Sequence, residues 1–356
     1  MNQHLERLCR ELPEGVDAAL IESDVSRRYY TGFPSSAGTL LVFRDAAQLV
    51  IDFRYIEAAR AAADGYEVAL LQKRVPQLQA IFAAHGARSV AIETERTTVS
   101  AYAALQKEFP AIEFVADGRL DAVVSRHRAV KSPGEYATMC RAAAIADRAF
   151  SEILNFVHPG VTERAVADEM VRLLRAFGGD GESFDTIALS GPNTSKPHGV
   201  PGSRAVQAGE FFLIDFGTVV EGYCSDMTRT FAVGHATDEM RAVYETVAAA
   251  QQAGFDAIRP GAVCGDVDAA ARSVIDGAGY RGCFGHSLGH SLGLEIHEKP
   301  NFAPGDKTVA QAGMLLSVEP GIYLAGKFGV RIEDTVWITP QGYENLAHSP
   351  KNLMIL

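Results

Sequence analysis

The sequence predicts an α/β domain followed by an α+β domain that is built from two similar halves. Its 356 residues suit two domains of ordinary size. Short apolar runs alternate with stretches of helical spacing over roughly the first 120 residues, which is typical of an α/β domain. Further along, several short motifs recur at a spacing of about 100 residues, which is far too long for a solenoid. That spacing predicts two related halves.

The N-terminal part contains four short apolar runs and two helical stretches, with turn residues between them. The runs expected to form strands are residues 18–21, 38–43, 47–51 and 89–92. Residues 56–63 and 75–85 have apolar side chains at helical spacing. Their alternation predicts a mixed sheet that is covered by helices.

A domain boundary is expected near residues 122–131, and we assign residues 1–124 and 125–356 to the two domains. Ser132 is followed by Pro133 and, three residues after the serine, by Glu135, the pattern of a helix-capping box. The helix that begins there has an apolar face that is repeated at three- and four-residue steps. This helix therefore opens the second domain.

The second domain repeats its turn motifs and its acidic strands. The paired motifs are Pro159-Gly160 with Pro260-Gly261, and Gln207-Ala208-Gly209 with Gln311-Ala312-Gly313. Each Gln-Ala-Gly motif leads into an apolar strand that ends in an acid, first Asp215 and then Glu319. A second acid with a threonine two residues later follows in each half, first Asp226 and then Glu333. Two such halves facing each other would place all four acids in one site.

Composition excludes some functions and favours a compartment. The net charge of −11 argues against nucleic acid or an anionic membrane as a partner, because no excess of Lys and Arg is available to meet phosphates. The five cysteines are odd in number, with no pair at metal-finger spacing, so a disulfide framework is not expected. No stretch approaches the roughly 18 apolar residues of a membrane span. We therefore expect a cytoplasmic protein.

The first pair of acids lies in a sequence that reads as a β-hairpin. With Val220 and Glu221 as a two-residue loop, Asp215 falls directly opposite Asp226. Side chains in that relation have Cβ atoms roughly 4.5–5.5 Å apart. Two carboxylates at this separation repel each other unless a cation lies between them, so the pattern indicates a metal. The alternative is a pair of solvated acids at strand ends.

The second pair of acids, Glu319 and Glu333, lies in otherwise apolar strands. A buried carboxylate is costly unless it is paired or bound to a metal. A structural salt bridge is the alternative, with Arg331 as an available partner. Four acids at equivalent places in two halves are difficult to obtain from unrelated ion pairs, which favours the metal.

Four histidines could complete such a site. His286, His290 and His297 lie within twelve residues in a glycine-rich stretch, and we expect one metal ligand, one substrate-facing residue and one spectator among them. His198 lies in a loop rich in Gly, Pro and Ser, where functional residues often occur, although simple solvent exposure is the alternative. Four carboxylates and one imidazole suit two divalent cations, with Mn²⁺ or Co²⁺ favoured and Zn²⁺ or Fe²⁺ also compatible. In such a pair a bridging hydroxide is a nucleophile at neutral pH.

Six motifs together carry a resemblance to a known family. They are PHG, IDFG, SDMTRTF, GHSLGLEIHE, SVEPGIY and GVRIEDT. In this order, over about residues 125–350, they resemble the pita-bread metallopeptidases, which include Xaa-Pro aminopeptidases, prolidases and methionine aminopeptidases. The N-terminal YYTGF and DFRY resemble the shorter proline peptidases. The resemblance implies an α/β creatinase-type N-terminal domain and an α+β pita-bread C-terminal domain with an internal pseudo-twofold repeat.

The resemblance also implies roles for individual residues. Asp226, His290 and Glu333 would hold one metal, and Asp215 and Glu319 the other, with Asp215 bidentate and Glu333 bridging. Glu319 would also act as general base, His198 and His297 would bind substrate and stabilise the tetrahedral intermediate, and Arg331 would orient the site from behind the ligands. The implied partners are a peptide with proline in second position and a second copy of the chain in a homodimer.

One departure from the family pattern bears on specificity. Many prolidases have an arginine just after the HE-x-P segment, where it meets the substrate carboxylate, but here the residue is Asn301, with Lys299 two positions earlier. This favours an Xaa-Pro aminopeptidase over an Xaa-Pro dipeptidase. A creatinase-like amide hydrolase that uses no metal, and a non-catalytic binding module, are the other readings. The N-terminal domain disfavours a methionine aminopeptidase.

Overall fold

The computed structural model describes residues 2–356 and divides into two compact units, Met1–Arg128 and Ala129–Leu356. The boundary predicted after Val124 lies inside helix α6 (Arg119–Ala129), four residues before this division. Within residues 2–356, none of the helices combines the length and the apolar character that a membrane span requires.

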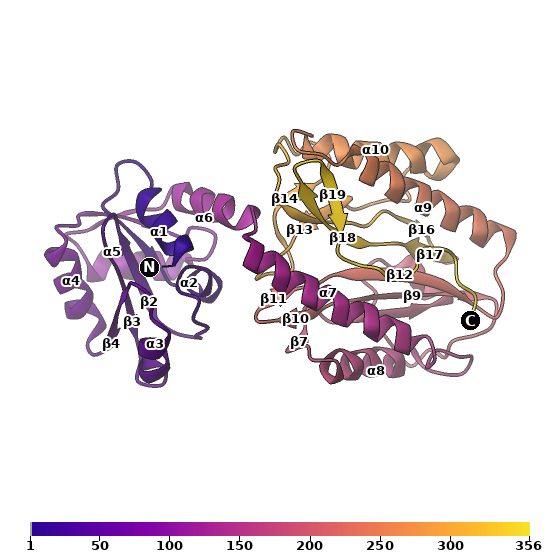
Figure 1. The fold of residues 1–356 in the computed structure, drawn as a ribbon, viewed down its shortest axis with the longest axis horizontal. Helices are drawn as coiled ribbons and strands as arrows, with labels where there is room; N and C mark the ends of the chain where they lie inside the picture. Colours follow the sequence, from indigo (N-terminus) through magenta and orange to yellow (C-terminus); the bar gives the residue numbers. More distant parts are fainter. Residues whose placement is uncertain (1) are drawn as a thin grey trace. The chain divides into compact units, whose positions relative to one another are not determined.

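The N-terminal unit is a six-stranded mixed sheet with helices around it (Figure 1). Its strands are β1 (Ala18–Ile21), β2 (Thr39–Phe43), β3 (Ala47–Ile51), β4 (Glu67–Leu70), β5 (Ser89–Ile92) and β6 (Glu113–Val115), in the order β4-β3-β2-β1-β5-β6. The helices that precede α6 are α1 (Gln3–Arg10), α2 (Asp24–Thr31), α3 (Ile56–Ala62), α4 (Arg74–Ala84) and α5 (Val99–Glu108). Strand β1 is antiparallel to β2 and parallel to β5, so the predicted mixed sheet is confirmed.

The C-terminal unit contains four long helices and several small antiparallel sheets. The helices are α7 (Pro133–Ile153), α8 (Glu163–Ala176), α9 (Asp238–Ala257) and α10 (Cys264–Ile275), with two single turns, η1 (Gly191–Ser195) and η2 (Asp276–Tyr280). Helices α7 and α8 lie along one side of the strands, and α9 and α10 along the other (Figure 1).

The strands of this unit fall into two related groups. Those of the first half are β7 (Gly181–Glu182), β8 (Ile187–Ser190), β9 (Glu210–Phe216), β10 (Thr218–Val220), β11 (Tyr223–Cys224) and β12 (Met227–Val233). Those of the second half are β13 (Gly289–Ser291), β14 (Glu298–Phe302), β15 (Leu315–Val318), β16 (Gly321–Leu324), β17 (Phe328–Arg331), β18 (Asp334–Thr339) and β19 (Gly342–Asn345). The sheets run β12-β9-β8, β11-β10-β7, β14-β13-β15-β18-β19 and β16-β17.

The capping box predicted at the start of α7 is confirmed. The Ser132 side chain accepts a hydrogen bond from the Glu135 N–H, and the Glu135 carboxylate accepts one from the Ser132 N–H at 2.8 Å. The predicted apolar face of α7 is buried, including Met139, Phe150 and Ile153. The cap fixes where the helix begins, and the buried face fixes its rotation against the strands.

The two halves repeat their turns as well as their sequence. Gly160 and Gly261 have φ of 95° and 90°, a left-handed conformation that glycine adopts without steric cost. Their N–H groups donate to Val206 and Ala310 respectively, both at 2.9 Å. The same turn therefore precedes the second helix of each pair, α8 and α10, and closes onto the approach to a central strand.

The glycines that open the central strands are also equivalent. Gly209 and Gly313 have φ of 84° and 92°. Their N–H groups donate to Val233 at 2.7 Å and Ile338 at 2.8 Å, at the far ends of β12 and β18. The predicted internal repeat is thus confirmed in backbone conformation and in hydrogen bonding. In each half it places a buried antiparallel strand pair in front of two helices.

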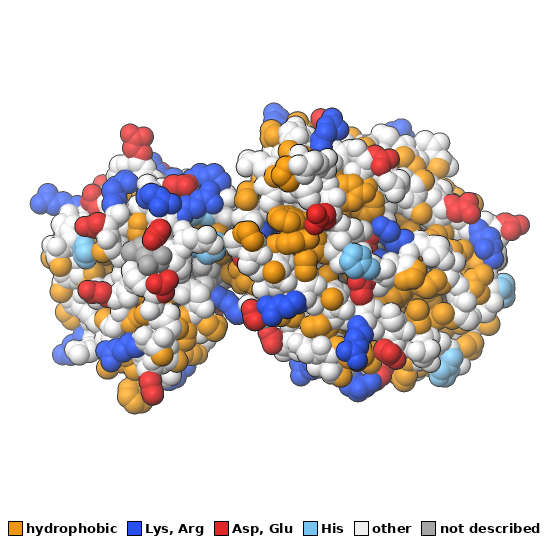
Figure 2. Space-filling view, viewed as in Figure 1, with side chains coloured by type: hydrophobic (Ala, Val, Ile, Leu, Met, Phe, Trp, Pro, Cys, Tyr) orange, Lys and Arg blue, Asp and Glu red, His pale blue; other side chains and the backbone are white. Residues whose placement is uncertain are grey.

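Figure 2 shows acidic and basic side chains mixed over one face of the molecule, with patches of hydrophobic side chains between them on the C-terminal unit. The interior of that unit is apolar, and β9 and β12 are buried along almost their whole length. Polar groups that occur within this interior therefore require partners, which makes the acids at the strand ends informative.

Candidate metal centre

Strands β9 and β12 carry the first two acids, in a register that differs from the prediction. Asp215 pairs with Thr228, so the expectation that Asp215 lies directly opposite Asp226 is wrong. The true register is shifted by two residues. Because side chains alternate with a period of two, both carboxylates still lie on the same face, with Asp226 diagonal to Asp215.

The hairpin turn explains this shift. Val220 pairs with Tyr223, so the loop is Glu221-Gly222 and not Val220-Glu221. Both loop residues have positive φ, 48° at Glu221 and 82° at Gly222. A type I′ turn, one of the two-residue turns that match the twist of the strands, requires positive φ at both positions, and glycine provides it at the second. The turn thus forms around Gly222.

The second half brings its acids to the same place. Glu319 follows β15, and its N–H donates to Leu288 at 2.7 Å, while Ser317 Oγ donates to the Glu319 carboxylate at 3.2 Å. Glu333 lies between β17 and β18. Its N–H donates to the carbonyl of Thr228 at 3.1 Å, and Thr228 Oγ1 donates to Glu333 Oε2 at 2.6 Å. Thr228 therefore joins the two halves directly at the acids.

His290 on β13 completes the cluster. Its Nε2 lies 3.5 Å from Asp226 Oδ2 and 3.4 Å from Glu319 Oε1. One potential ligand atom from each of Asp226, His290 and Glu333 lies within 4.8 Å of the other two. The structure thus brings together the five side chains that the sequence singled out as ligands, with Asp215 held beside them by Arg331.

The buried acids of the cluster are not balanced by nearby positive charge within residues 2–356. Burial raises the pKa of Asp226 well above its usual range, and the neighbouring charges of Asp215 and Glu319 raise it further. Burial and the charge of Asp226 likewise raise the pKa of Glu333. Burial raises the pKa of Glu319 to about 8. Burial lowers the pKa of His290 to about 4, so its ring is neutral and free to act as a ligand near neutral pH.

Two orphaned oxygen atoms test whether this cluster fits a metal. Asp215 Oδ1 and Glu333 Oε1 are buried and have no hydrogen-bond partner among residues 2–356. A buried carboxylate oxygen without a donor is costly, and a divalent cation is a partner that would satisfy it. Hard oxygen ligands and one neutral imidazole are also a suitable donor set. The residues present therefore fit a metal centre.

Arg331, the available salt-bridge partner for Glu319 and Glu333, makes its direct ion pair with Asp215. The buried guanidinium also donates to Thr228 Oγ1 at 3.0 Å and to the Tyr323 hydroxyl at 2.9 Å. One Nη donates to the carbonyl of Pro197 at 3.3 Å. Arg331 thus links one acid of the first half to the loop that carries His198.

The remaining histidines lie around the acids. The ring of His297 is 4.4 Å from that of His290, edge to face. Partial burial and the charge of His198 lower the pKa of His297. His286 Nε2 lies 2.9 Å from the Tyr323 hydroxyl, to which Arg331 also donates.

Tyr323 and its contact with His286 were missed by the sequence reasoning. Arg331 donates to the Tyr323 hydroxyl, which in turn contacts His286, and Arg331 lies eight residues after Tyr323 and 45 after His286. No spacing rule connects such positions. The one available signal was the polar tyrosine in an apolar strand just after Glu319.

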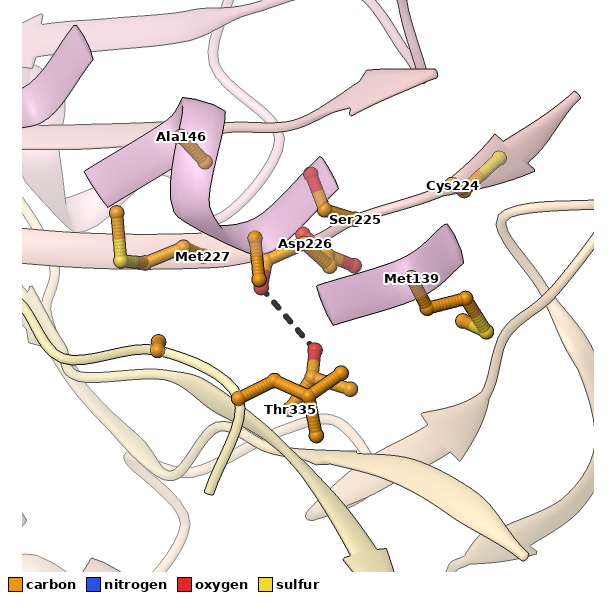
Figure 3. Close-up of a pocket in the computed structure, with 10 residues that line it drawn as sticks. Met139, Ala146, Cys224, Ser225, Asp226, Met227 and Thr335 are labelled. Atoms are coloured by element: carbon orange, nitrogen blue, oxygen red, sulfur yellow. Dashed lines mark hydrogen bonds between the residues drawn. The ribbon is translucent and has the colours of Figure 1, made fainter. Parts of the chain in front are cut away.

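A small apolar pocket lies behind Asp226 (Figure 3). Met139 and Ala146 of α7 line it, together with Cys224 and Thr335. Thr335 Oγ1 donates to the carbonyl of Asp226 at 3.1 Å, drawn as a dashed line in Figure 3. The threonine that follows Glu333 thus holds the backbone of the first half, whereas Thr228, which follows Asp226, bonds to the carboxylate of the second half.

Comparison with known proteins identifies two family matches in the chain. Residues 137–340 match the profile of metallopeptidase family M24, and residues 3–130 match the creatinase/prolidase N-terminal domain. A Xaa-Pro dipeptidase of Lactobacillus delbrueckii subsp. lactis is 37% identical over 365 residues, covering 99% of each chain.

Two solved structures are similar along nearly the whole chain. A Xaa-Pro dipeptidase from Bacillus anthracis has a TM-score of 0.94 at 39% identity, covering 99% of each chain. An X-Pro aminopeptidase from Thermotoga maritima MSB8 has a TM-score of 0.89 at 33% identity, covering 96% of this chain and 98% of that one. The predicted creatinase-type and pita-bread domains are therefore confirmed.

Fold, repeat and acid cluster together define a metal-dependent hydrolase. More particularly, the chain belongs to metallopeptidase family M24.

Proposed function

We propose that the protein is an Xaa-Pro aminopeptidase, which hydrolyses the bond between an N-terminal residue and proline with the help of two divalent metal ions. The observation that carries this proposal is the buried cluster of four acids and His290, which has two unpartnered oxygen atoms. The similar proteins named Xaa-Pro dipeptidase and X-Pro aminopeptidase support the class of substrate.

The cluster divides naturally into two sets of ligands. Asp226, His290 and Glu333 would hold one ion, and Asp215 and Glu319 the other, with Glu333 between them. Mn²⁺ fits this oxygen-rich set best, and Co²⁺, Zn²⁺ or Fe²⁺ could also be accommodated. When bound, such a pair supplies an activated water and stabilises negative charge on the substrate carbonyl.

The chain's own residues would perform the remaining steps. Glu319 would accept the proton of the attacking water on a carboxylate oxygen and pass it to the departing proline nitrogen. His198 and His297 would donate hydrogen bonds to the oxygen on which charge develops, since positioned donors are most effective there. Arg331 would keep Asp215 oriented through their buried ion pair. Proline has no N–H after the scissile bond, so such a site must accept a tertiary amide.

The length of the preferred peptide depends on how a terminal carboxylate is met. Asn301 pairs with His290 across β13 and β14, so it lies on the same sheet face as that ligand. In the amide orientation that satisfies its hydrogen bonds, Asn301 Nδ2 lies 3.2 Å from the carbonyl oxygens of Glu298 and Pro300 and donates to both. A neutral side chain bonded to its own strand does not form an ion pair with a substrate carboxylate, which favours longer peptides.

A Xaa-Pro dipeptidase is the second candidate, because two of the similar proteins carry that name. The deciding measurement is kcat/KM for one Xaa-Pro dipeptide and for the same peptide extended by one residue, at matched pH and Mn²⁺ concentration. We expect the tripeptide to be cleaved at least as well as the dipeptide. Strict preference for the dipeptide would reject the aminopeptidase assignment but keep the metallopeptidase one.

We also propose that the enzyme acts in the cytoplasm and as a homodimer, as expected from its composition and its family. Light scattering on the purified protein gives the mass directly. A mass of about 38 kDa would indicate a monomer and reject the dimer.

A further inference from the structure

Glu163, at the start of α8, has a buried carboxylate that takes no part in the metal cluster. The residue has no exposed surface. Oε1 accepts hydrogen bonds from the Ser190 N–H at 2.8 Å, from Ser190 Oγ at 2.9 Å and from Asn193 Nδ2 at 3.0 Å. Oε2 accepts from the Gly202 N–H at 3.2 Å and also faces Asn193 Nδ2 at 3.3 Å. Both oxygens are therefore used.

These donors come from the two ends of one loop. Ser190 ends β8 and Asn193 lies in η1, whereas Gly202 follows on the other side of the loop. The residues between Asn193 and Gly202 include His198, which the proposed function places at the substrate. A single carboxylate thus joins the two arms of the His198 loop at its base.

Backbone contacts hold the returning arm beside the same residue. The Glu163 N–H donates to the carbonyl of Arg204 at 3.0 Å, and the Arg164 N–H donates to that of Gly202, also at 3.0 Å. Arg204 in turn donates to Ser190 Oγ at 2.5 Å, so it connects the returning arm to the outgoing one. The base of the loop is therefore a closed polar network centred on Glu163.

The rest of the loop is fixed against β17 of the second half. Thr194 Oγ1 accepts from the Gly329 N–H at 2.8 Å, and a Cβ at position 329 would come within 2.3 Å of the Thr194 carbonyl oxygen. Only glycine allows that approach. The carbonyl of Pro197, one residue before His198, accepts from Arg331. The loop is thus held at its base by Glu163 and near its tip by β17.

We propose that Glu163 is a positioning residue for His198, acting through the two arms of this loop. The inference rests on the proposed role of His198. A carboxylate is suited to the task because its oxygens accept from both arms at once, whereas a glutamine side chain has one acceptor and one donor. In Glu163→Gln, at least one arm loses its acceptor while the volume of the side chain is kept.

The test is a double-mutant cycle with Glu163→Gln, His198→Ala and the combined variant, each assayed with Mn²⁺ on an Xaa-Pro tripeptide. We expect Glu163→Gln to lower kcat/KM roughly 10- to 100-fold, the scale of loss for a misplaced catalytic group, with metal content unchanged. In the His198→Ala background, Glu163→Gln should have little further effect, since the residue that it positions is gone.

Glu169→Gln is the matched control, because Glu169 lies on the same helix and, within residues 2–356, its carboxylate pairs with the exposed Arg172 and not with the His198 loop. It should leave kcat/KM unchanged. The inference is overturned if Glu163→Gln behaves like this control, or if its loss is equally large with and without His198, which would indicate a purely structural role.

Asn193→Ala is a second variant, in case Glu163→Gln does not fold. It removes the other end of the same contact at a half-buried position, and it should show the same dependence on His198. The substrate role of His198 and the positioning role of Glu163 can be rejected separately. A fully active His198→Ala variant rejects the substrate role of His198. If His198→Ala is impaired while Asn193→Ala and Glu163→Gln are each fully active, only the positioning role of Glu163 is rejected.

Discussion

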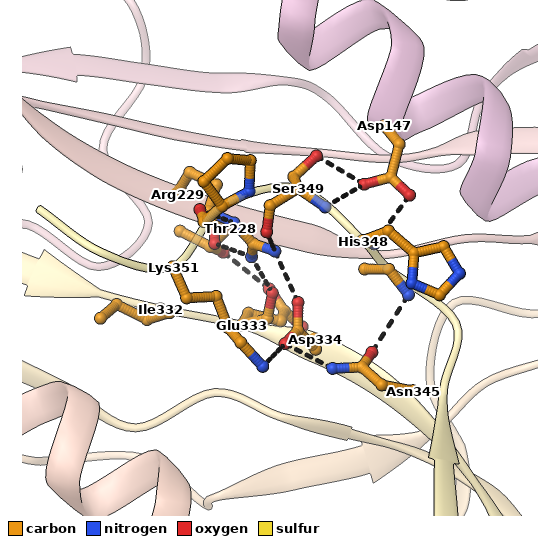
Figure 4. A network of polar contacts seen from close by, with 12 residues as sticks. Asp147, Thr228, Arg229, Ile332, Glu333, Asp334, Asn345, His348, Ser349 and Lys351 are labelled. Atoms are coloured by element: carbon orange, nitrogen blue, oxygen red, sulfur yellow. Dashed lines mark hydrogen bonds and ion pairs between the residues drawn. The ribbon is translucent and has the colours of Figure 1, made fainter. Parts of the chain in front are cut away.

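Glu333 and Asp334 are neighbours in the sequence and both are buried, yet their surroundings are opposite. Asp334 is matched by the chain itself, as Figure 4 shows. Its Oδ1 accepts from the Arg229 guanidinium at 2.7 Å, and its Oδ2 accepts from Lys351 Nζ at 2.6 Å and from Asn345 Nδ2 at 2.7 Å. Two cations and an amide thus satisfy one carboxylate.

The Glu333 carboxylate is not neutralised in this way within residues 2–356. One oxygen accepts from Thr228, the other has no partner among residues 2–356, and the charges around it are mainly those of other acids. The comparison teaches how to recognise a ligand in a folded chain. A buried acid that is neutralised by cations of the chain stabilises the fold. A buried acid that lacks such cations is a candidate ligand for a bound metal ion.

The Arg229 network also explains how Glu333 is held in place. Arg229 donates to the backbone carbonyls of Thr228 and Glu333, and to those of Ser349 and Pro350 near the C-terminus. The neutralised acid and its arginine therefore support the backbone that carries the ligand (Figure 4).

Replacing Glu333 and Asp334 in turn is expected to give the largest effects and tests whether their roles differ. We expect Glu333→Ala to lose metal and at least ~10³-fold in activity, because a ligand worth several kcal/mol is gone, while the metal-free protein stays folded. Asp334→Ala should instead lower the free energy of unfolding by about 3–5 kcal/mol, since it leaves the buried Arg229 guanidinium without its anion. Elemental analysis, activity and chemical denaturation of both variants check this. The same pattern of loss in both would show that the two acids have the same role.

Replacing His297 sharpens the distinction between ligands and their neighbours. We expect His297→Ala to keep both metals and to lower kcat/KM by roughly 10²–10³, the usual loss for one donor to the transition state. Metal content is measured on the same preparation as kcat/KM. If the variant loses metal, His297 is a ligand and the assignment of His290 must be revised.

The pH dependence of stability in the metal-free protein tests whether the acid cluster lacks compensating positive charge. A carboxyl group whose pKa is raised on folding favours the folded state at low pH, and this contribution is lost as the pH rises through the raised value. For Glu319 that value is about 8. Buried histidines such as His286 and His290, with pKa values lowered to about 4, add stability as the pH rises until the unfolded rings, with an ordinary pKa of about 6.5, have lost their protons at about pH 7.5.

Between pH ~7.5 and ~8.5, where the histidines no longer titrate in either state, we therefore expect the melting temperature of chelator-treated protein to fall by about 1 °C or more. With Mn²⁺ present it should stay nearly level, since the ions balance the charge that appears. Thermal melts across this range, with and without Mn²⁺, provide the measurement. A metal-free melting temperature that rises with pH would mean that these acids are not short of positive charge.

Local sequence signals predicted much of the N-terminal unit and the opening of the C-terminal one. Strands β1, β3 and β5 have the predicted limits, and β2 begins one residue later because Gly38 has a φ of 129°, outside the range of a strand. Apolar periodicity and turn residues depend on neighbours in the chain, so they can be read without the fold. The repeat then indicated where the acids would gather.

Other features of the site depended on long-range contacts. The register of β9 and β12 was wrong by two residues, because the choice between adjacent turns depended on which residues could take positive φ. Tyr323 and Glu163 were not identified, since their partners lie far away in the sequence and lack a spacing rule. The four acids among the five proposed ligands could be singled out because acids in apolar strands are anomalous wherever they occur, whereas His290 was chosen among three neighbouring histidines from the family resemblance.

The most direct test of the account is to titrate Mn²⁺ into chelator-treated protein by calorimetry, with activity followed in parallel. We predict two ions bound per chain, with activity absent before the titration and restored as the sites fill. The control is Glu333→Ala, which should bind fewer ions and stay inactive. Full activity in a preparation that elemental analysis shows to be free of metal would contradict the central claim that this acid cluster is a catalytic metal centre.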